Sequence, residues 1–128
     1  MKEKDFQSKF NRWLELCWNA DVSARFELKF IDLSKKKRLN FKSDIKEHQI
    51  RSLSAHRHIF KIPDCGYQNP YDCYHISGRG YLVVQFWKPR EKNFYIIDIR
   101  EIKRLIKSGV KSINEDDCHK IGIKHWFQ

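Results

Sequence analysis

The chain has 128 residues, which is enough for one domain with a single hydrophobic core and too few for two. Apolar residues make up 41% of it, with nine Phe, five Tyr and four Trp, so the composition excludes a disordered chain. The net charge of +10 indicates a polyanionic partner, with nucleic acid the first choice and an acidic membrane surface the second.

Neither the apolar runs nor the cysteines indicate a membrane-spanning or secreted protein. No apolar run reaches the roughly 18 residues of a membrane span, and the charged start MKEKDFQSKF lacks the apolar core of a signal peptide. The four cysteines are widely spaced, without a CxxC pair. We therefore expect reduced, mostly buried thiols in a cytoplasmic protein.

The first predicted elements are a helix and a strand. Apolar residues from Phe6 to Trp18 repeat with helical spacing and predict a helix over residues 4–19. A strand begins near Ser23, and in it Glu27 and Lys29 alternate with aromatic and aliphatic residues. A carboxylate and an ammonium therefore share one face of this strand. Such groups are costly to bury unless they pair with each other, a metal or a substrate.

A basic turn and a second helix follow. The turn at residues 34–38 is predicted to be solvated and to contact phosphates. Asp44 and Glu47 form a variant of the capping box and predict a helix over residues 44–54. Within it Gln49 interrupts an apolar stripe formed by Ile45 and Leu53.

The remaining elements complete an α/β domain over residues 1–128, in which a central mixed sheet is flanked by helices. Residues 58–62 are expected to form a strand parallel to the first, as in a right-handed βαβ unit. Residues 71–77 and 81–87 are predicted to pair as a hairpin through a Gly-Arg-Gly turn. A strand at 93–99, a helix at 100–108 that stops at Gly109 and a short helix after Asn114 follow.

The polar residues suggest phosphodiester cleavage, which uses hard oxygen ligands around Mg²⁺ or Mn²⁺ and a nearby cation. Glu27 could ligate the metal, and Lys29 could supply the cation. A second carboxylate is needed, and the best candidate is Asp72, which follows Pro70 at the start of a predicted strand. Asp64, which also follows a proline, is the second choice.

The segment Glu27-Leu28-Lys29, the basic turn, His48-Gln49 and the strand after them resemble the later part of the PD-(D/E)xK nuclease core. The likeness is closest to Holliday junction resolvases of the recombination-protein-U and phage type. It covers residues 25–62 and, more loosely, 69–87, and it implies a restriction-endonuclease-like core. It also implies that Glu27 ligates metal, that Lys29 orients water or stabilises charge, and that Gln49 supports the site.

The sequence departs from this family in one respect. The family's Asp normally precedes the E-x-K strand, whereas here Asp72 follows it, so we expect a migrated or permuted site. Glu3, Asp5 or Gln7 on the first helix could supply the further acid or amide that many members carry there. Because such resolvases make two symmetric cuts, the resemblance also implies a homodimer.

The sequence thus predicts a Mg²⁺-dependent endodeoxyribonuclease that acts on branched DNA such as a Holliday junction. The residues expected to contact the nucleic acid are Lys35, Lys36, Lys37, Arg38 and His48. Two alternatives stay open. One is a non-catalytic nucleic-acid-binding module on the same fold, and the other is a protein-interaction subunit whose charge serves solubility.

The candidate residues also have plain structural interpretations. Glu27 and Lys29 fit a solvated strand face, Gln49 a helix amide bonded to backbone, and Asp72 a turn acceptor. His48 points about 100° away from Gln49 on a helix and fits a surface or phosphate-facing histidine better than a general base. A rival zinc site would combine cysteines and histidines: Cys65, Cys73 and His75, with Cys118 and His119. The C-x7-C-x-H spacing of the first three matches no common zinc motif.

Overall fold

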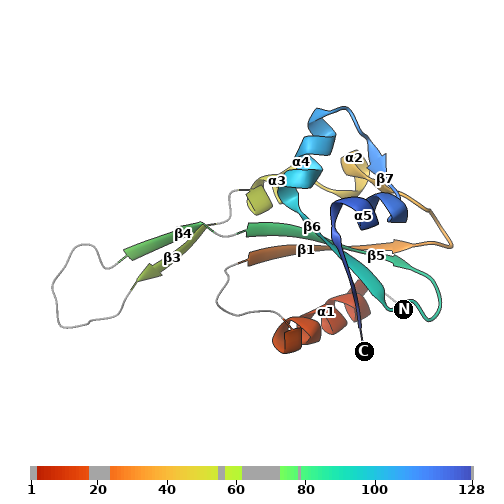
Figure 1. Cartoon of the computed structure of the whole chain (residues 1–128), viewed down its shortest axis with the longest axis horizontal. Coiled ribbons are helices and arrows are strands. Elements are labelled where there is room, and N and C mark those ends of the chain that lie inside the picture. Colours follow the sequence, from red (N-terminus) through yellow and green to blue (C-terminus); the bar gives the residue numbers. More distant parts are fainter. Residues whose placement is uncertain (1–2, 18–23, 55–56, 62–72, 78, 128) are drawn as a thin grey trace.

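Figure 1 shows a computed structural model of the chain, which describes residues 3–17, 24–54, 57–61, 73–77 and 79–127. Its middle layer is a four-stranded sheet made of β1 (Ala24–Asp32), β5 (Arg79–Trp87), β6 (Asn93–Asp98) and β8 (Ile123–Trp126), in that order. The β1–β5 pair is parallel, whereas β5–β6 and β6–β8 are antiparallel. The predicted α/β class with a mixed sheet is therefore confirmed.

Helices cover both faces of this sheet (Figure 1). On one face lies α1 (Glu3–Cys17), and on the other lie α2 (Phe41–Asp44), α3 (Glu47–Ser54), α4 (Ile99–Lys107) and α5 (Glu115–Ile121). Two small antiparallel pairs complete the fold: β2 (Leu39–Asn40) with β7 (Ser112–Ile113), and β3 (Arg57–Lys61) with β4 (Cys73–Ser77). The β3–β4 hairpin projects away from the three layers. Among the helices of the described ranges, none is long and apolar enough to cross a membrane.

Each face of the sheet has its own core, because successive side chains of a strand point to opposite faces. On β5, Leu82 and Val84 belong to the cluster beneath α3 and α4. Val83, between them, belongs to the cluster beneath α1, together with Phe6 and Phe10. A strand buried on both faces reads as a continuous apolar run, and β5 is such a strand.

The predicted strand pairing was wrong in two places. The parallel partner of β1 is β5, with Glu27 opposite Leu82, and not the strand at residues 58–62. That strand, β3, pairs with β4 instead, so residues 71–77 and 81–87 do not form a hairpin with each other. A short apolar run predicts a strand but does not say which strand it pairs with. β1 pairs with β5, which is apolar on both faces and therefore lies in the middle of the sheet.

The predicted helix at residues 44–54 starts later, at Glu47, where α3 begins, and α2 is a separate short helix that ends at Asp44. Ile45 is extended (φ −118°, ψ 117°) and separates α2 from α3. The cap of α2 is Asn40, whose side chain accepts from the backbone N–H groups of Lys42 and Ser43. Asp44 does not cap a helix, because it ends α2 and accepts from the backbone N–H of Asn40 at 2.7 Å.

The C-terminal third follows the predictions more closely. α4 begins after its cap Asp98 and ends before Gly109, whose φ of +89° suits a residue without a side chain. Asn114 caps α5 with a complete capping box that includes Asp117. The sequence did not predict β2, β7 or β8. The first two have two residues each, which is too short for a periodic signal.

Candidate functional site

Glu27 and Lys29 lie on β1, at one end of the strand order, on the face covered by α3. Phe26 and Leu28 point the other way, into the core beneath α1. Lys29 Nζ is 3.7 Å from Glu27 Oε1, and the two side chains are 16% and 32% exposed. The alternation therefore places both charges on one face, half-buried and within reach of a molecule at the edge of the sheet.

Gln49, in the first turn of α3, joins these two residues. Its Nε2 donates to Glu27 Oε1 at 2.7 Å, and Lys29 Nζ donates to its Oε1 at 3.0 Å. The same oxygen accepts from the backbone N–H of Lys46 at 3.0 Å, which is half of a capping box at the start of α3. Gln49 is thus both a helix-capping amide and the link between the acid and the amine. We call Glu27, Lys29 and Gln49 the E-K-Q cluster.

A glycine on the neighbouring strand holds α3 close to the cluster. A Cβ on Gly80 would lie 2.2 Å from the carbonyl oxygen of Leu53, so only glycine allows the last turn of α3 to rest on β5. Arg25, opposite Gly80 in the β1–β5 register, donates to Ser52 Oγ. The Gly-Arg-Gly pattern predicts a hairpin turn at Gly80, whereas the structure places Gly80 within β5. A glycine beside an apolar strand also signals close backbone approach, and that signal was missed.

One oxygen of the cluster is left for a ligand. Glu27 Oε1 is held by Gln49 and Lys29, whereas no residue in the described ranges bonds to Glu27 Oε2. A carboxylate oxygen of this kind is the hard donor that Mg²⁺ and Mn²⁺ prefer. The described part of the site therefore offers one carboxylate oxygen beside a fixed ammonium group.

The acids predicted to join Glu27 are not part of the described cluster. Asp72 and Asp64 lie outside the described residues. Convergence of a second carboxylate on Glu27 thus stays a prediction.

The polar residues at the start of α1 do not reach the E-K-Q cluster. Glu3, Asp5 and Gln7 are exposed, while Phe6 and Phe10 of the same helix are buried against the sheet. α1 covers the face of the sheet opposite to Glu27, so the helix and the cluster are separated by the sheet itself (Figure 1). The suggestion that one of these residues completes the site was wrong.

The basic residues after β1 form an exposed turn, but two of them are engaged within the protein. Lys36 pairs with Asp44. Arg38 donates to Ser112 Oγ at 2.8 Å and to its carbonyl oxygen at 3.1 Å. Lys35 and Lys37 have no ion pair within the described ranges and remain available for phosphates. His48 is exposed on α3, next to Gln49.

The described residues of the rival zinc site lie on two separate elements, β4 and α5. Cys118 is buried in the core, and burial raises the pKa of its thiol to about 12, so it is protonated at neutral pH. Cys65 lies outside the described residues, as do the side chains of β4. Among the residues that the structure describes, no group of three or more His, Cys, Asp or Glu side chains is placed to hold a metal ion.

Comparisons with protein-family models, with curated proteins and with solved structures found no match to this chain. The geometry of the E-K-Q cluster and the distribution of charge around it are therefore the basis on which a function is proposed.

Proposed function

We propose that this protein is a metal-dependent endodeoxyribonuclease with a restriction-endonuclease-like core, acting on branched DNA such as a Holliday junction. The observation that carries the proposal is the E-K-Q cluster. A strand places an acid and an amine side by side, and a helix amide bonds both of them. This arrangement agrees with the E-x-K strand and Gln-bearing helix of the PD-(D/E)xK nucleases that the sequence resembles.

The donor set fits Mg²⁺ or Mn²⁺. Magnesium keeps several of its waters in proteins and is commonly held by only one or two carboxylates, so Glu27 Oε2 with Asp72 or Asp64 would suffice. When bound, the ion would polarise the scissile phosphate and lower the pKa of a water molecule. We infer that Glu27 is the ligand supplied by β1.

The residues around this oxygen have complementary roles. The Lys29 ammonium would stabilise the negative charge that develops on the phosphate during attack. Gln49 holds that ammonium at 3.0 Å while its amide nitrogen fixes the carboxylate at 2.7 Å. Because each of its groups is bonded, Gln49 keeps the acid and the amine oriented before substrate arrives. It is a positioning residue in this proposal.

The charge distribution supports DNA binding on the same side of the sheet as the cluster. α1, on the opposite face, is balanced: Glu3, Asp5 and Glu15 against Lys4, Lys9 and Arg12. On the cluster face, residues 41–54 and 99–107 hold more bases than acids: Lys42, Lys46, Arg51, Arg100, Lys103, Arg104 and Lys107 against Asp44, Glu47 and Glu101. α5, on the same face, is acidic, with Glu115, Asp116 and Asp117 against Lys120, so the basic part of this face is the one formed by α2, α3 and α4. A backbone bound there and at Lys35 and Lys37 would release counterions, so affinity should fall with salt.

The test is cleavage of a four-way junction, compared with a linear duplex of the same sequence, with Mg²⁺, with Mn²⁺ and with EDTA. We expect metal-dependent cutting of the junction. Glu27→Gln and Lys29→Ala should lower the rate by at least about a hundredfold while DNA affinity is retained. Matched controls are Glu15→Gln and Lys9→Ala, which change the same residue types on α1, on the opposite face of the sheet.

Asp72→Asn and Asp64→Asn identify the second carboxylate, because cutting should be abolished only by the variant that removes the metal ligand. Sedimentation of the protein with and without DNA tests the proposed homodimer. Full activity in Glu27→Gln would refute the proposal.

A non-catalytic DNA-binding module is the second candidate. It is favoured by one observation: in the described ranges, Glu27 is the single carboxylate of the E-K-Q cluster. This candidate predicts that the wild-type chain binds DNA in a salt-dependent manner but does not cut it with Mg²⁺, with Mn²⁺ or with EDTA.

A further inference from the structure

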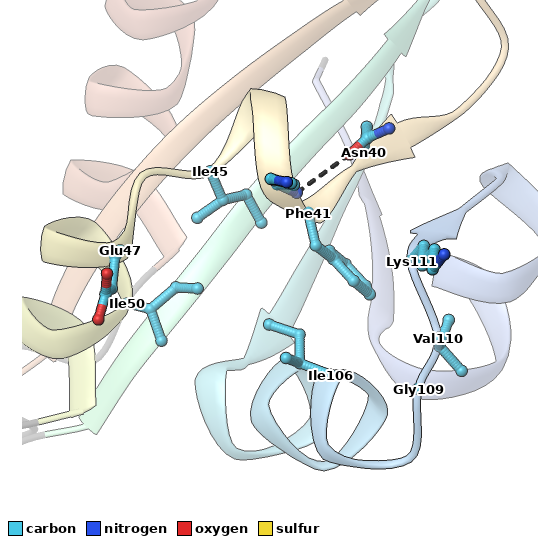
Figure 2. A pocket seen from close by; sticks show the side chains of 10 residues that line it. Asn40, Phe41, Ile45, Glu47, Ile50, Ile106, Gly109, Val110 and Lys111 are labelled. Atoms are coloured by element: carbon cyan, nitrogen blue, oxygen red, sulfur yellow. Dashed lines mark hydrogen bonds between the residues drawn. The ribbon is translucent and has the colours of Figure 1, made fainter.

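A groove with apolar walls lies on the cluster side of the sheet, between α2 and α3 on one side and α4 with the segment after it on the other (Figure 2). Its volume is about 660 Å³, within the range of sites that bind small molecules or peptide side chains. Phe41 and Ile45 are the buried part of its lining, and Ile50, Ile106 and Val110 also line it. None of these residues belongs to the E-K-Q cluster.

Two apolar side chains in this groove are exposed without a structural need. Ile106 is 39% exposed and Val110 is 36% exposed. On α4 the contact with the core is already made by Ile102, which is fully buried, and by Leu105. Ile106 therefore extends the apolar face of α4 beyond what the sheet covers. Apolar groups gathered in an open groove indicate that something else covers them.

Charged residues mark the two ends of the groove. Glu47 lies beside Ile50 at one end, and Lys111 lies beyond Val110 at the other (Figure 2). Lys42 of α2 also lines the groove, and the backbone N–H of its neighbour Phe41 donates to the Lys111 carbonyl at 3.0 Å. Within the described ranges, Glu47, Lys42 and Lys111 take part in no ion pair shorter than 4.0 Å. The groove is thus apolar along its length and basic at one end.

We propose that this groove binds a short segment of a partner protein in which apolar side chains adjoin acidic residues. The apolar side chains lie against Ile106 and Val110, and the acids lie at Lys42 and Lys111. The segment docks with its acidic end away from Glu47, which would repel it. This proposal shares Lys42 with the basic face proposed for DNA, but it uses neither the E-K-Q cluster nor the basic turn after β1.

The same charges disfavour the other occupants. A second copy of this chain would offer Ile123 and Trp126, which are 65% and 62% exposed. These two side chains point to opposite faces of β8, and Lys124, on the same face as Trp126, would meet the lysines of the groove. A nucleic-acid backbone would gain from the lysines but nothing from the aliphatic walls, and it would be repelled by Glu47. A segment with both apolar and acidic groups matches both parts of the lining.

The experiment uses the full chain and two fluorescently labelled synthetic peptides of equal length. Both carry leucine and phenylalanine anchors, followed at one end by aspartates in one peptide and at the same end by lysines in the other. Anisotropy should show micromolar binding of the acidic peptide only. Ile106→Glu and Lys111→Glu should each weaken it by at least roughly tenfold, which is about 1.4 kcal/mol. Ile123→Glu and Lys107→Glu, which lie outside the groove lining, should leave it unchanged.

Four results would overturn the proposal: no binding of the acidic peptide, equal binding of both peptides, the same affinity in Ile106→Glu, or competition by duplex DNA that Ile106→Glu does not alter. Circular dichroism of each variant confirms that it is folded. A dimer in sedimentation that Ile106→Glu dissociates would assign the groove to self-association instead. Because cleavage of DNA is not measured, failure of this test leaves the nuclease proposal untouched.

Discussion

The carbonyl oxygen of Leu53 occupies the space that a side chain on Gly80 would need, since a Cβ there would come within 2.2 Å of it. The end of α3 thus rests directly on β5. The start of the same helix carries Gln49, which bonds Glu27 and Lys29 of β1. The spacing between helix and sheet at Gly80 therefore decides whether the amide reaches its partners.

Gly80→Ala should destabilise the protein and disrupt the cluster together. A methyl group forced against backbone has no flexible neighbour to move, and overpacking of this kind costs about 1–3 kcal/mol or more. The measurement is urea unfolding, with the Lys29 side-chain amine followed by NMR. Gly109→Ala is the control: nothing lies within 4 Å of its Cβ, but its φ of +89° is strained. It should cost about 1 kcal/mol and leave the Lys29 signal unchanged. Equal stability of Gly80→Ala and wild type would contradict the contact.

Gln49→Leu should lower both stability and the proposed activity. The substitution removes the amide N–H that donates to Glu27. It also removes the amide oxygen that accepts from Lys29 Nζ and from the Lys46 backbone N–H, so half-buried polar groups lose their partners. We expect a loss of about 1–3 kcal/mol in the free energy of unfolding. The control is Gln7→Leu on α1, where the side chain is exposed. Coupling is measured by a double-mutant cycle with Glu27→Leu, which has no acceptor, and strict additivity of the two changes would show that the 2.7 Å bond contributes nothing.

How much of this site the sequence predicts depends on which signals are local. Period-two alternation placed Glu27 and Lys29 on one face, and helical periodicity placed Gln49 inward, because both depend only on neighbouring residues. The pairing of β1 with β5 joins residues more than fifty positions apart, such as Glu27 and Leu82, and no local pattern specifies it. The break at Ile45 was missed for a different reason, since here one local contact competes with another. Asp44 bonds the backbone of Asn40 and the side chain of Lys36, and these contacts outweigh its tendency to cap.

Gln85→Met should stabilise the protein. Gln85 is fully buried on β5, opposite Phe30, and its Oε1 has no hydrogen-bond partner in the described ranges. Its Nε2 makes one long bond, 3.4 Å, to the carbonyl of Asn93. Burying an amide oxygen without a hydrogen-bond partner destabilises the fold by more than one 3.4 Å hydrogen bond stabilises it. Methionine has nearly the same shape as glutamine and no such polar groups. We expect a gain of about 1 kcal/mol in thermal or urea unfolding. A loss of similar size would mean that the amide has a partner, such as a buried water.

His125 should make stability depend on pH in a narrow window. Its ring lies 4.9 Å from that of Trp13 and 5.7 Å from that of Phe94, and burial lowers its pKa below the usual 6.5. The unfolded chain therefore takes up a proton at this residue before the folded chain does. Stability is fully present above about pH 6.5 and falls as the pH drops below it, by at most about 1.4 kcal/mol per pH unit.

Urea unfolding at a series of pH values between about 5 and 8 tests this dependence. His125→Phe keeps an aromatic ring against Trp13 and Phe94 and should flatten the slope, whereas His48→Gln, at an exposed position on α3, should not. The pKa values of Asp32 and Asp98 are lowered from their usual value of 3.8, so these two carboxylates affect stability only at a more acidic pH, below about that value. If His125→Phe retained the full slope, another group would have to be the one that is protonated on unfolding.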